Sequence, residues 1–292
     1  MGGDARGRAT IDPLIDSRCR RFRLVALRRW GAVFVLVGSA LLAGGCGGAG
    51  GAPLSENATQ PYRAAPLDVR EPAATDVSCA HSGRPIENGQ PSYAAVVRTV
   101  AVAYARPGGG RVVGRFGRID ENGYPSVFGV VAVRTNSACK PTWYRVQLPV
   151  APNGTTGWVA ARAVRTYAVV SRIVVRLSAR RLVAYRSGRP ILRARIAVGS
   201  PQTPTPVGHF FVDERFLLSD ASGPFGVAAL GISAHSEVLT DWVQGGPIAL
   251  HGTNEPASIG NAVSHGCIRL ANDDMRRLFD LAPAGTPVTI LR

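Results

Sequence analysis

From residue 93 onward the sequence is a succession of short β-rich runs separated by turn clusters. Between residues 93 and 164, apolar runs with many β-branched residues lie at 96–104, 112–116, 127–133, 143–148 and 157–160. The clusters between them are rich in Gly, Pro and Asn, as in the stretch RPGGG at 106–110. Short strands at such spacing are typical of all-β folds, including small barrels. We therefore expect a mainly β protein.

A second β-rich unit is expected from residue 167 to the end. Hydrophobic strands are predicted at 173–177, 182–185, 191–198 and 288–291. One helix is predicted after residue 271: Asn272 is its N-cap, two acidic residues favour its first turn, and Pro283 stops it. Two modest domains also agree with a length of 292 residues once a removable leader is subtracted.

The first 45 residues have the features of an export signal. An Arg-rich segment precedes an apolar run of 13 residues at 31–43, which is shorter than the about 20 residues that span a bilayer. Directly after the run stand small residues and Cys46, a pattern that resembles a bacterial lipobox, although that motif prefers Leu where Ala43 stands. The resemblance implies that Cys46 is lipidated. An uncleaved membrane anchor and simple secretion are the alternatives.

Residues 46–78 are rich in Gly, Ala and Pro and contain few large apolar residues, which predicts a flexible tether. Two of the five cysteines, Cys79 and Cys139, can pair in an oxidising compartment and close a loop of about 60 residues. Such a crosslink stabilises the fold by about 4 kcal/mol in the chain-entropy model. Cys267 would then be the single free thiol of the exported chain.

The charge of the chain is unevenly distributed. The formal net charge is +15, yet residues 122–212 contain no Asp or Glu while arginines crowd into 162–195. Attraction to an anionic polymer or lipid surface and a solvated strand face in a basic protein explain this stretch equally well. We expect no nucleic-acid partner, because helix-turn-helix, zinc-finger and RNP-like patterns are missing from the sequence.

Two short segments bring histidines and the free thiol together: residues 248–254 read IALHGTN, and residues 264–270 read SHGCIRL. If the second segment is extended, its side chains alternate, so Ile268 enters the core while Cys267 and Arg269 share the opposite face. Leu250 likewise points inward and His251 outward. A thiol, an imidazole and a guanidinium are therefore expected on one surface of one sheet.

This combination suits acyl transfer by a thiol. A free thiol has a pKa of about 8.5, and a neighbouring imidazole or guanidinium is expected to lower the pKa of Cys267. His251 would take the thiol proton and later return one to the leaving amine. Gly266 removes bulk beside the thiol, and the N–H groups of Gly266 and Cys267 would face an oxyanion.

Two other readings of these residues are weaker. A zinc site built from His235, His251, His265 and Cys267 is chemically permissible, but one residue between His265 and Cys267 is less than the usual ligand spacing. We therefore do not favour a zinc site here. In a papain-like peptidase the cysteine normally precedes its histidine in the chain, which is the opposite of the order found here.

Residues 168–291 resemble the L,D-transpeptidase catalytic domain of the YkuD family. The resemblance rests on GSP at 199–201, TPTPVG at 203–208, HGTN at 251–254 and SHGCIR at 264–269, with His251 and Cys267 16 residues apart. It implies a β-rich fold in which Cys267 is the nucleophile and His251 the general base and acid. The Gly252 carbonyl would orient His251.

The same resemblance implies roles for the residues around the thiol. Backbone amides near His265, Gly266 and Cys267 would form the oxyanion hole. The residues expected to contact substrate are Arg269, Ser264 and Thr253. The resemblance also implies that the chemistry uses no metal and no cofactor.

The earlier unit resembles bacterial SH3-like domains in ARP at 105–107, WYRV at 143–146 and especially NGTTGWV at 153–159. In that family the module is usually an accessory that binds cell wall or positions a catalytic partner. We expect Trp143 and Trp158 to pack in the core rather than to contact a ligand. The predicted organisation is a signal peptide at 1–45, a tether at 46–78, an SH3-like barrel at 79–166 and the catalytic domain at 167–292.

The resemblance implies a peptidoglycan L,D-transpeptidase. Cys267 would attack the carbonyl that follows the diamino acid of a tetrapeptide stem, expel D-alanine, and pass the acyl group to the side-chain amine of another stem. Expected partners are stem peptides, the membrane through a lipid anchor, and carbapenem-type inhibitors, at an extracytoplasmic position facing the cell wall. The alternatives are an L,D-carboxypeptidase that uses water, and a non-catalytic wall-binding lipoprotein, against which the intact Cys267, His251 and Arg269 argue.

Overall fold

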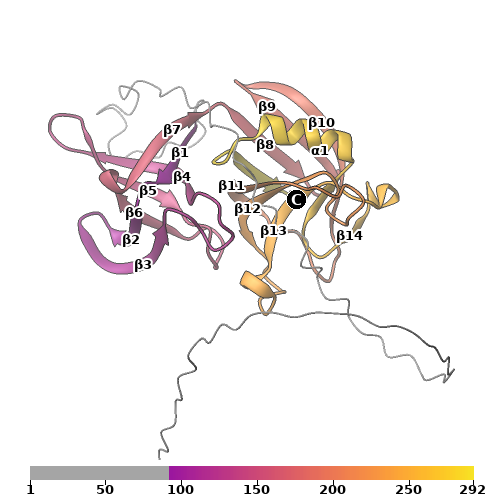
Figure 1. Cartoon of the computed structure of the whole chain (residues 1–292), viewed down its shortest axis with the longest axis horizontal. Helices are drawn as coiled ribbons and strands as arrows, with labels where there is room; N and C mark the ends of the chain where they lie inside the picture. The colour runs from indigo at the N-terminus through magenta and orange to yellow at the C-terminus, as the bar shows by residue number, and fades with distance from the viewer. Residues whose placement is uncertain (1–91) are drawn as a thin grey trace, which may run out of the picture. The chain divides into compact units, whose positions relative to one another are not determined.

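The computed structural model describes residues 92–292. The predicted signal peptide, the tether, Cys46 and Cys79 lie outside these residues. The described chain is mainly β and contains one α-helix of more than a single turn, which confirms the fold class expected from the short apolar runs (Figure 1). All described residues belong to one compact unit.

Seven antiparallel strands form the first sheet, in the spatial order β3-β2-β6-β5-β4-β1-β7. In chain order they are β1 (Ser92–Val97), β2 (Val100–Arg106), β3 (Gly109–Gly117), β4 (Val127–Thr135), β5 (Pro141–Gln147), β6 (Thr156–Ala160) and β7 (Val164–Val169). The run expected at 96–104 is therefore two strands. They separate at a bend where the Arg98 amide leaves the ladder and donates to the Ala163 carbonyl (2.9 Å).

The two tryptophans of this sheet are not in its core, contrary to expectation. Alternation along β5 directs Tyr144 and Val146 into the core, so Trp143 lies on the other face. There Trp143 and Trp158 are half-buried, and the Trp143 ring packs edge-on against Tyr104 with 6.1 Å between centroids. The core is filled by smaller apolar side chains around Phe128.

Nine strands form the second sheet, in the order β14-β10-β15-β13-β12-β11-β16-β8-β9. They are β8 (Ser171–Arg176), β9 (Arg181–Arg186), β10 (Arg189–Gly199), β11 (Gly208–Leu217), β12 (Ala228–His235), β13 (Pro247–His251), β14 (Ala262–Ser264), β15 (Ile268–Leu270) and β16 (Pro287–Leu291). The long strand β10 also pairs with β9 and so joins the two ends of this order. Residue 167 lies in β7 of the first sheet, and the chain changes sheet at Val170.

The first and second sheets meet through specific polar contacts. Tyr167 Oη donates to the Ala284 carbonyl (2.6 Å) beside a small apolar cluster. The Asn153 amide donates to the His235 carbonyl and accepts from the His235 N–H, both at 2.8 Å. The two hydrogen bonds between Asn153 and His235 hold the end of β12, from which the chain continues toward the candidate site.

The helix α1 (Asn272–Leu281) lies where it was predicted, and Met275, Leu278 and Phe279 form its buried face. Its N-cap position is Ala271, however, which provides no side-chain cap. Asn272 is the first helical residue, and its Oδ1 accepts a hydrogen bond from the Thr253 N–H (2.9 Å) instead. The Thr253 amide, 19 residues earlier in the chain, therefore uses the side-chain oxygen that was expected to cap the helix.

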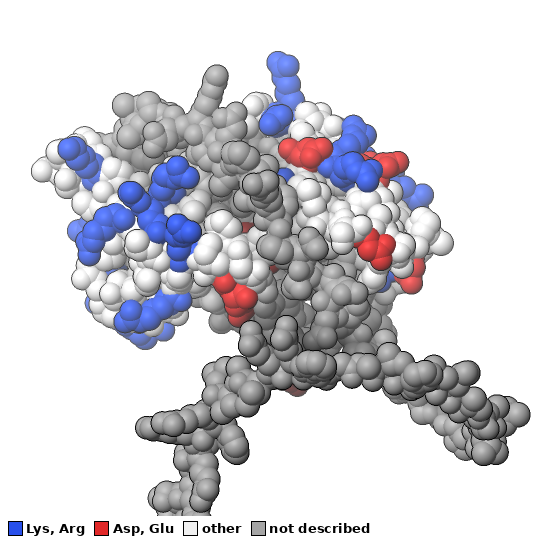
Figure 2. All heavy atoms as spheres, viewed as in Figure 1, with Lys and Arg blue, Asp and Glu red and all other residues white. Residues whose placement is uncertain are grey.

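Three single-turn 3₁₀ segments complete the described chain: η3 (Ala161–Ala163), η4 (Val243–Gly245) and η5 (Pro256–Ser258). On the face shown in Figure 2, basic side chains dominate over the first sheet, whereas basic and acidic side chains mix over the second. This agrees with the acid-free stretch seen in the sequence. Among residues 92–292 no helix has the length and apolarity needed to cross a membrane.

Candidate active site

His251 ends β13 in the middle of the second sheet. It lies opposite Ala229 of β12 on one side and opposite Arg269 of β15, in a parallel pair, on the other. Its neighbour Leu250 is fully buried in the core, as predicted. The His251 ring is nevertheless only 4% exposed, because Phe225 packs edge-on against it with 4.8 Å between centroids.

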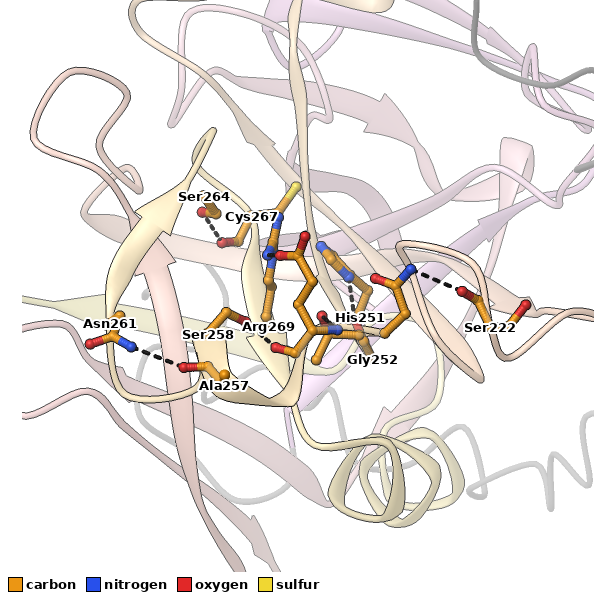
Figure 3. A network of polar contacts seen from close by, with 12 residues as sticks. Ser222, His251, Gly252, Ala257, Ser258, Asn261, Ser264, Cys267 and Arg269 are labelled. Carbon is orange, nitrogen blue, oxygen red and sulfur yellow. Dashed lines mark hydrogen bonds and ion pairs between the residues drawn. The ribbon is translucent and has the colours of Figure 1, made fainter. Parts of the chain in front are cut away.

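The imidazole is held by its own neighbour in the chain. His251 Nδ1 lies 2.6 Å from the Gly252 carbonyl oxygen, as Figure 3 shows. Burial lowers the pKa of His251 to about 4, the contact with the Gly252 carbonyl opposes this shift, and the Arg269 charge adds to it. The ring is therefore neutral at physiological pH, with Nδ1 as the donor and Nε2 left as a base.

Gly252 is required by close packing. A Cβ atom at this position would collide with Asn272 Oδ1 and approach the Phe225 carbonyl and the Val227 amide to 3.1 Å. The start of α1 and the segment before β12 thus enclose the carbonyl that orients His251. A larger residue would displace one of these walls.

Cys267 follows a tight turn that leads into β15. Gly266 has φ = +116°, and a Cβ there would lie 2.8 Å from Ile248 Cδ1, so a glycine is needed. Ser264 Oγ donates to the Cys267 carbonyl (2.6 Å) and accepts from the Gly266 N–H (3.2 Å). The Gly266 amide predicted for the oxyanion hole therefore has an internal partner. Ser264 is 2% exposed and shapes the turn.

The thiol of Cys267 has a raised pKa, whereas the sequence predicted a lowered one. Burial is the main cause and outweighs the two effects that lower the pKa, a hydrogen bond with the Ala249 backbone and the Arg269 charge. Side chains two residues apart on a strand share a face, and Ile268 between them is buried, so Cys267 and Arg269 lie together as predicted. Within residues 92–292 Cys267 is the free cysteine.

Cys139 is disulfide-bonded. It has φ = +61° in the turn before β5. Its pairing with Cys79 stays a prediction, because Cys79 lies outside the described residues.

The GSP and TPTPVG motifs support the turn that carries the nucleophile. Thr205 is buried; its Oγ1 donates to the Gly266 carbonyl (2.8 Å) and accepts from the Gly199 N–H (2.9 Å). Thr203 Oγ1 donates to the Ser264 carbonyl (3.0 Å). These residues lie about 60 positions before Cys267 in the chain, and their contacts were not evident from the motif letters.

Arg269 is held by an acid that the sequence did not single out. Its Nη1 lies 2.6 Å from Glu255 Oε2, and the two side chains are 20% and 65% exposed. The Glu255 N–H donates to Thr253 Oγ1 (3.0 Å). Thr253 is 4% exposed, and its hydroxyl organises the loop; its contact with substrate stays a prediction. Glu255 could not be identified from the sequence as the partner of Arg269, because 14 residues separate the two and opposite charge alone does not single it out.

His265 is exposed, and its ring contacts Trp242 with centroids 5.5 Å apart. Trp242, 53% exposed, stands in the loop between β12 and β13 and was not predicted as part of the site. His235 lies at the end of β12. Among residues 92–292, no three His, Cys, Asp or Glu side chains gather in a way that could hold a metal ion.

A hollow of about 680 Å³ lies next to the HGTN segment. Asn254 Nδ2 donates to the Ser222 carbonyl (2.9 Å) across part of it. The lining residues are Ala221, Ser222, Thr253, Asn254, Pro256, Ala271, Asn272 and Asp273. The site is thus open on the side of α1.

The sequence has relatives that cover this half of the chain. The family model of the YkuD L,D-transpeptidase catalytic domain matches residues 170–290. YkuD of Bacillus subtilis (strain 168), whose name assigns it to the L,D-transpeptidases, is 38% identical over 126 residues, which are 43% of this chain and 69% of the relative. YbiS of Escherichia coli (strain K12), named in the same way, is 31% identical over 134 residues, covering 41% of this chain and 44% of YbiS.

Among solved structures, L,D-transpeptidase 3 from Mycobacterium tuberculosis is similar over 68% of this chain and 97% of that one, with 16% identity and a TM-score of 0.38. The B. subtilis relative is matched over more than two thirds of its length. The residues matched by the family model, 170–290, include the segments that carry His251 and Cys267. On that evidence the chain belongs to the YkuD family of L,D-transpeptidases.

Proposed function

We propose that this protein is a peptidoglycan L,D-transpeptidase that works through a Cys267 acyl-enzyme. The observation that carries the proposal is the His251 ring, held neutral by burial and oriented by the Gly252 carbonyl at 2.6 Å, on the sheet face that it shares with the free thiol. A neutral imidazole beside a protonated thiol can act as the general base that accepts the thiol proton. Membership of the family supports the same activity.

The first half-reaction forms a thioester. His251 Nε2 takes the proton of Cys267 as the sulfur attacks the carbonyl carbon that follows the diamino acid of a tetrapeptide stem. The tetrahedral oxyanion collapses, the C–N bond to the terminal D-alanine breaks, and the imidazolium returns its proton to the leaving amine. Because the thiol pKa is raised, proton transfer and attack are coupled here, in contrast to an enzyme that rests as a thiolate–imidazolium pair.

The second half-reaction regenerates the thiol. The side-chain amine of another stem attacks the thioester carbonyl, and His251 accepts a proton from that amine. The C–S bond breaks and the sulfur recovers the proton from His251. Water in place of the amine gives the carboxypeptidase reaction.

The oxyanion requires N–H donors near the sulfur. Since the Gly266 N–H donates to Ser264 Oγ, we assign this role to the backbone amides of His265 and Cys267. The left-handed Gly266 between them lets the turn present both neighbours toward the sulfur. Gly266 thus contributes by its conformation, and its own N–H is used inside the turn.

Mass spectrometry of products from a defined disaccharide tetrapeptide tests the function. We expect loss of one D-alanine and formation of a cross-linked dimer, and neither product with Cys267→Ser. Tripeptide without dimer would assign the carboxypeptidase reaction. Unchanged tetrapeptide, with Cys267 shown to be reduced, would favour the non-catalytic wall-binding alternative.

We also propose that the protein is exported and anchored by lipid at Cys46, with Cys79 bonded to Cys139 and an SH3-like unit before the catalytic domain. The lipobox-like residues before Cys46 and the disulfide bond of Cys139 support this arrangement. Cys46→Ser should move the protein from the membrane to the soluble fraction without a change in soluble activity. Membrane retention of that variant would assign anchoring to the apolar run, and peptide mapping that joins Cys139 to another cysteine would refute the pairing.

A further inference from the structure

Arginines gather on the outer face of the second sheet, where β8, β9 and β10 lie side by side (Figure 1). On each strand they alternate with side chains of the core, such as Val175, Leu182 and Ala194, so they point to the opposite face. We call this surface the arginine face, and its members are Arg172, Arg176, Arg181, Arg193 and Arg195. Arg172 is half-buried and the other members are exposed.

Like charges stand directly opposite one another on the arginine face. Arg181 of β9 is the register partner of Arg176 on one side and of Arg195 on the other. Neighbouring strands lie about 4.8 Å apart, and like charges in such positions destabilise a sheet. Among residues 92–292 the ion pairs lie elsewhere, at Arg269 and Arg276. An anion from outside the described chain would therefore stabilise this row.

The arrangement suits an extended anionic surface. The arginines stand on three adjacent strands and at successive outward positions along them, so they form a two-dimensional array and not a single line. Half-buried Val174 and Val183 pair in its middle, and the Arg172 guanidinium lies 4.1 Å from the centroid of the Tyr185 ring. Guanidinium groups bind phosphate with two parallel N–H donors, and tyrosine is favoured at lipid headgroups. A linear polyanion would meet one row of this array, whereas a lipid surface meets all of it.

The described chain begins beside the arginine face. Ser92 is the register partner of Val169, and β8 starts two residues later at Ser171. The Ser187 N–H, at the tip of the β9–β10 hairpin, donates to the Val170 carbonyl (2.8 Å). The segment that precedes Ser92 contains Cys46, the proposed lipidation site. An anchor at Cys46 would therefore join the folded part next to this face.

We propose that the arginine face binds the phosphate groups of an anionic phospholipid membrane. The inference rests on the proposed function for one point, the lipid anchor that brings the chain to a membrane. β10 continues from Arg195 to Ala197, which lies opposite Arg269 in β15. The arginine face and the candidate active site are thus neighbours on one sheet, and binding of the face to lipid holds the active site close to the membrane surface.

Vesicle co-sedimentation of the full-length protein tests the proposal. The Cys46→Ser background removes the lipid, so the result does not depend on whether the anchor exists. At about 0.1 M salt we expect affinity for vesicles that contain phosphatidylglycerol to exceed affinity for pure phosphatidylcholine about tenfold or more, and to fall as salt is raised. Arg176→Gln, Arg181→Gln and Arg193→Gln together should weaken binding to the anionic vesicles on the order of 100-fold, since each basic residue at such a surface strengthens binding about fivefold. Arg195 is left unchanged, because its Nη2 packs against Gly260 in the active-site loop.

Two further variants show whether the effect is one of charge at this place. The matched control removes three exposed arginines of the first sheet and should keep the affinity; its substitutions are Arg111→Gln, Arg115→Gln and Arg134→Gln. Lysine in place of the same three members of the arginine face keeps the charge and should retain most of the binding. The glutamine variant of the face should unfold at or above the wild-type temperature, because repulsion between the strands is relieved. Equal losses in the lysine and glutamine variants, or in the control, would overturn the proposal.

A footprint identifies the surface that touches lipid. Phenylglyoxal modifies accessible guanidinium groups, and peptide mass spectrometry reads each arginine separately. Anionic vesicles should protect Arg176, Arg181 and Arg193 and leave the three control arginines reactive. Equal protection of both groups would overturn the proposal, and tighter binding to soluble polyphosphate than to anionic vesicles would overturn it in favour of a linear polymer. D-alanine release from a soluble tetrapeptide is measured apart, so the proposed activity and this inference can fail independently.

Discussion

The Nδ1 atom of His251 lies 2.6 Å from the carbonyl oxygen of Gly252, the next residue in the chain. A carbonyl only accepts, so Nδ1 carries the hydrogen and Nε2 remains basic in the neutral ring. A carboxylate usually has this orienting role in a triad. A neutral carbonyl orients the ring without adding a negative charge, which is compatible with the lowered pKa of His251.

His251→Gln should reduce D-alanine release by about 10³-fold or more, because both proton transfers depend on the imidazole. Single-turnover measurement of acylation should show the loss directly. Partial recovery at high pH is expected, since hydroxide can ionise the thiol without His251. Wild-type acylation rates in this variant would move the general base to another residue.

The same histidine should make stability depend on pH. Its pKa is about 4 in the folded protein, against an ordinary value of 6.5, so between these two pH values the unfolded chain binds more protons. Stability therefore rises with pH through this window and falls on acidification, by about 3 kcal/mol in total. Urea unfolding at several pH values should show this component in the wild type and not in His251→Gln. Parallel pH curves for the two proteins would contradict the buried neutral ring.

A carbapenem should acylate the protein once, at Cys267, because a strained lactam carbonyl suits a thiol beside a general base and backbone N–H donors. Intact mass should rise by one inhibitor, and peptide mapping should place it on Cys267. Cys267→Ser, which keeps the size of the side chain, is the control and should remain unmodified. An adduct on any other residue would count against the assigned nucleophile.

Asn272 should matter through Thr253. Asn272→Ala removes the acceptor of the Thr253 N–H (2.9 Å) and is expected to destabilise the fold by about 1 to 3 kcal/mol, with lower activity because the HGTN loop loosens. Asn272→Asp keeps an oxygen at that position and should preserve most of both. Thermal unfolding and acylation rates check the pair. Equal effects of the two substitutions would show that the hydrogen bond is unimportant.

Several features of the site could be predicted from the letters alone. Alternation along residues 267–270 directs Ile268 and Leu270 to the core and leaves Cys267 and Arg269 on one face, because side-chain direction in a strand has a period of two. The apolar stripe of α1 was equally readable, since Met275, Leu278 and Phe279 recur at helical spacing. Local periodicity determines both features.

Other features were decided by tertiary structure. Tertiary packing made Asn272 the partner of Thr253 instead of a helix cap, and gave the Gly266 amide to Ser264. It brought Glu255 to Arg269, and turned Trp143 away from the core. The pKa of the Cys267 thiol is shifted in the direction opposite to the predicted one for the same reason. The Arg269 charge does lower this pKa, as the sequence predicted, but burial of Cys267 raises it by more. Burial and distant hydrogen-bond partners depend on how strands pair across the chain, which no short pattern encodes.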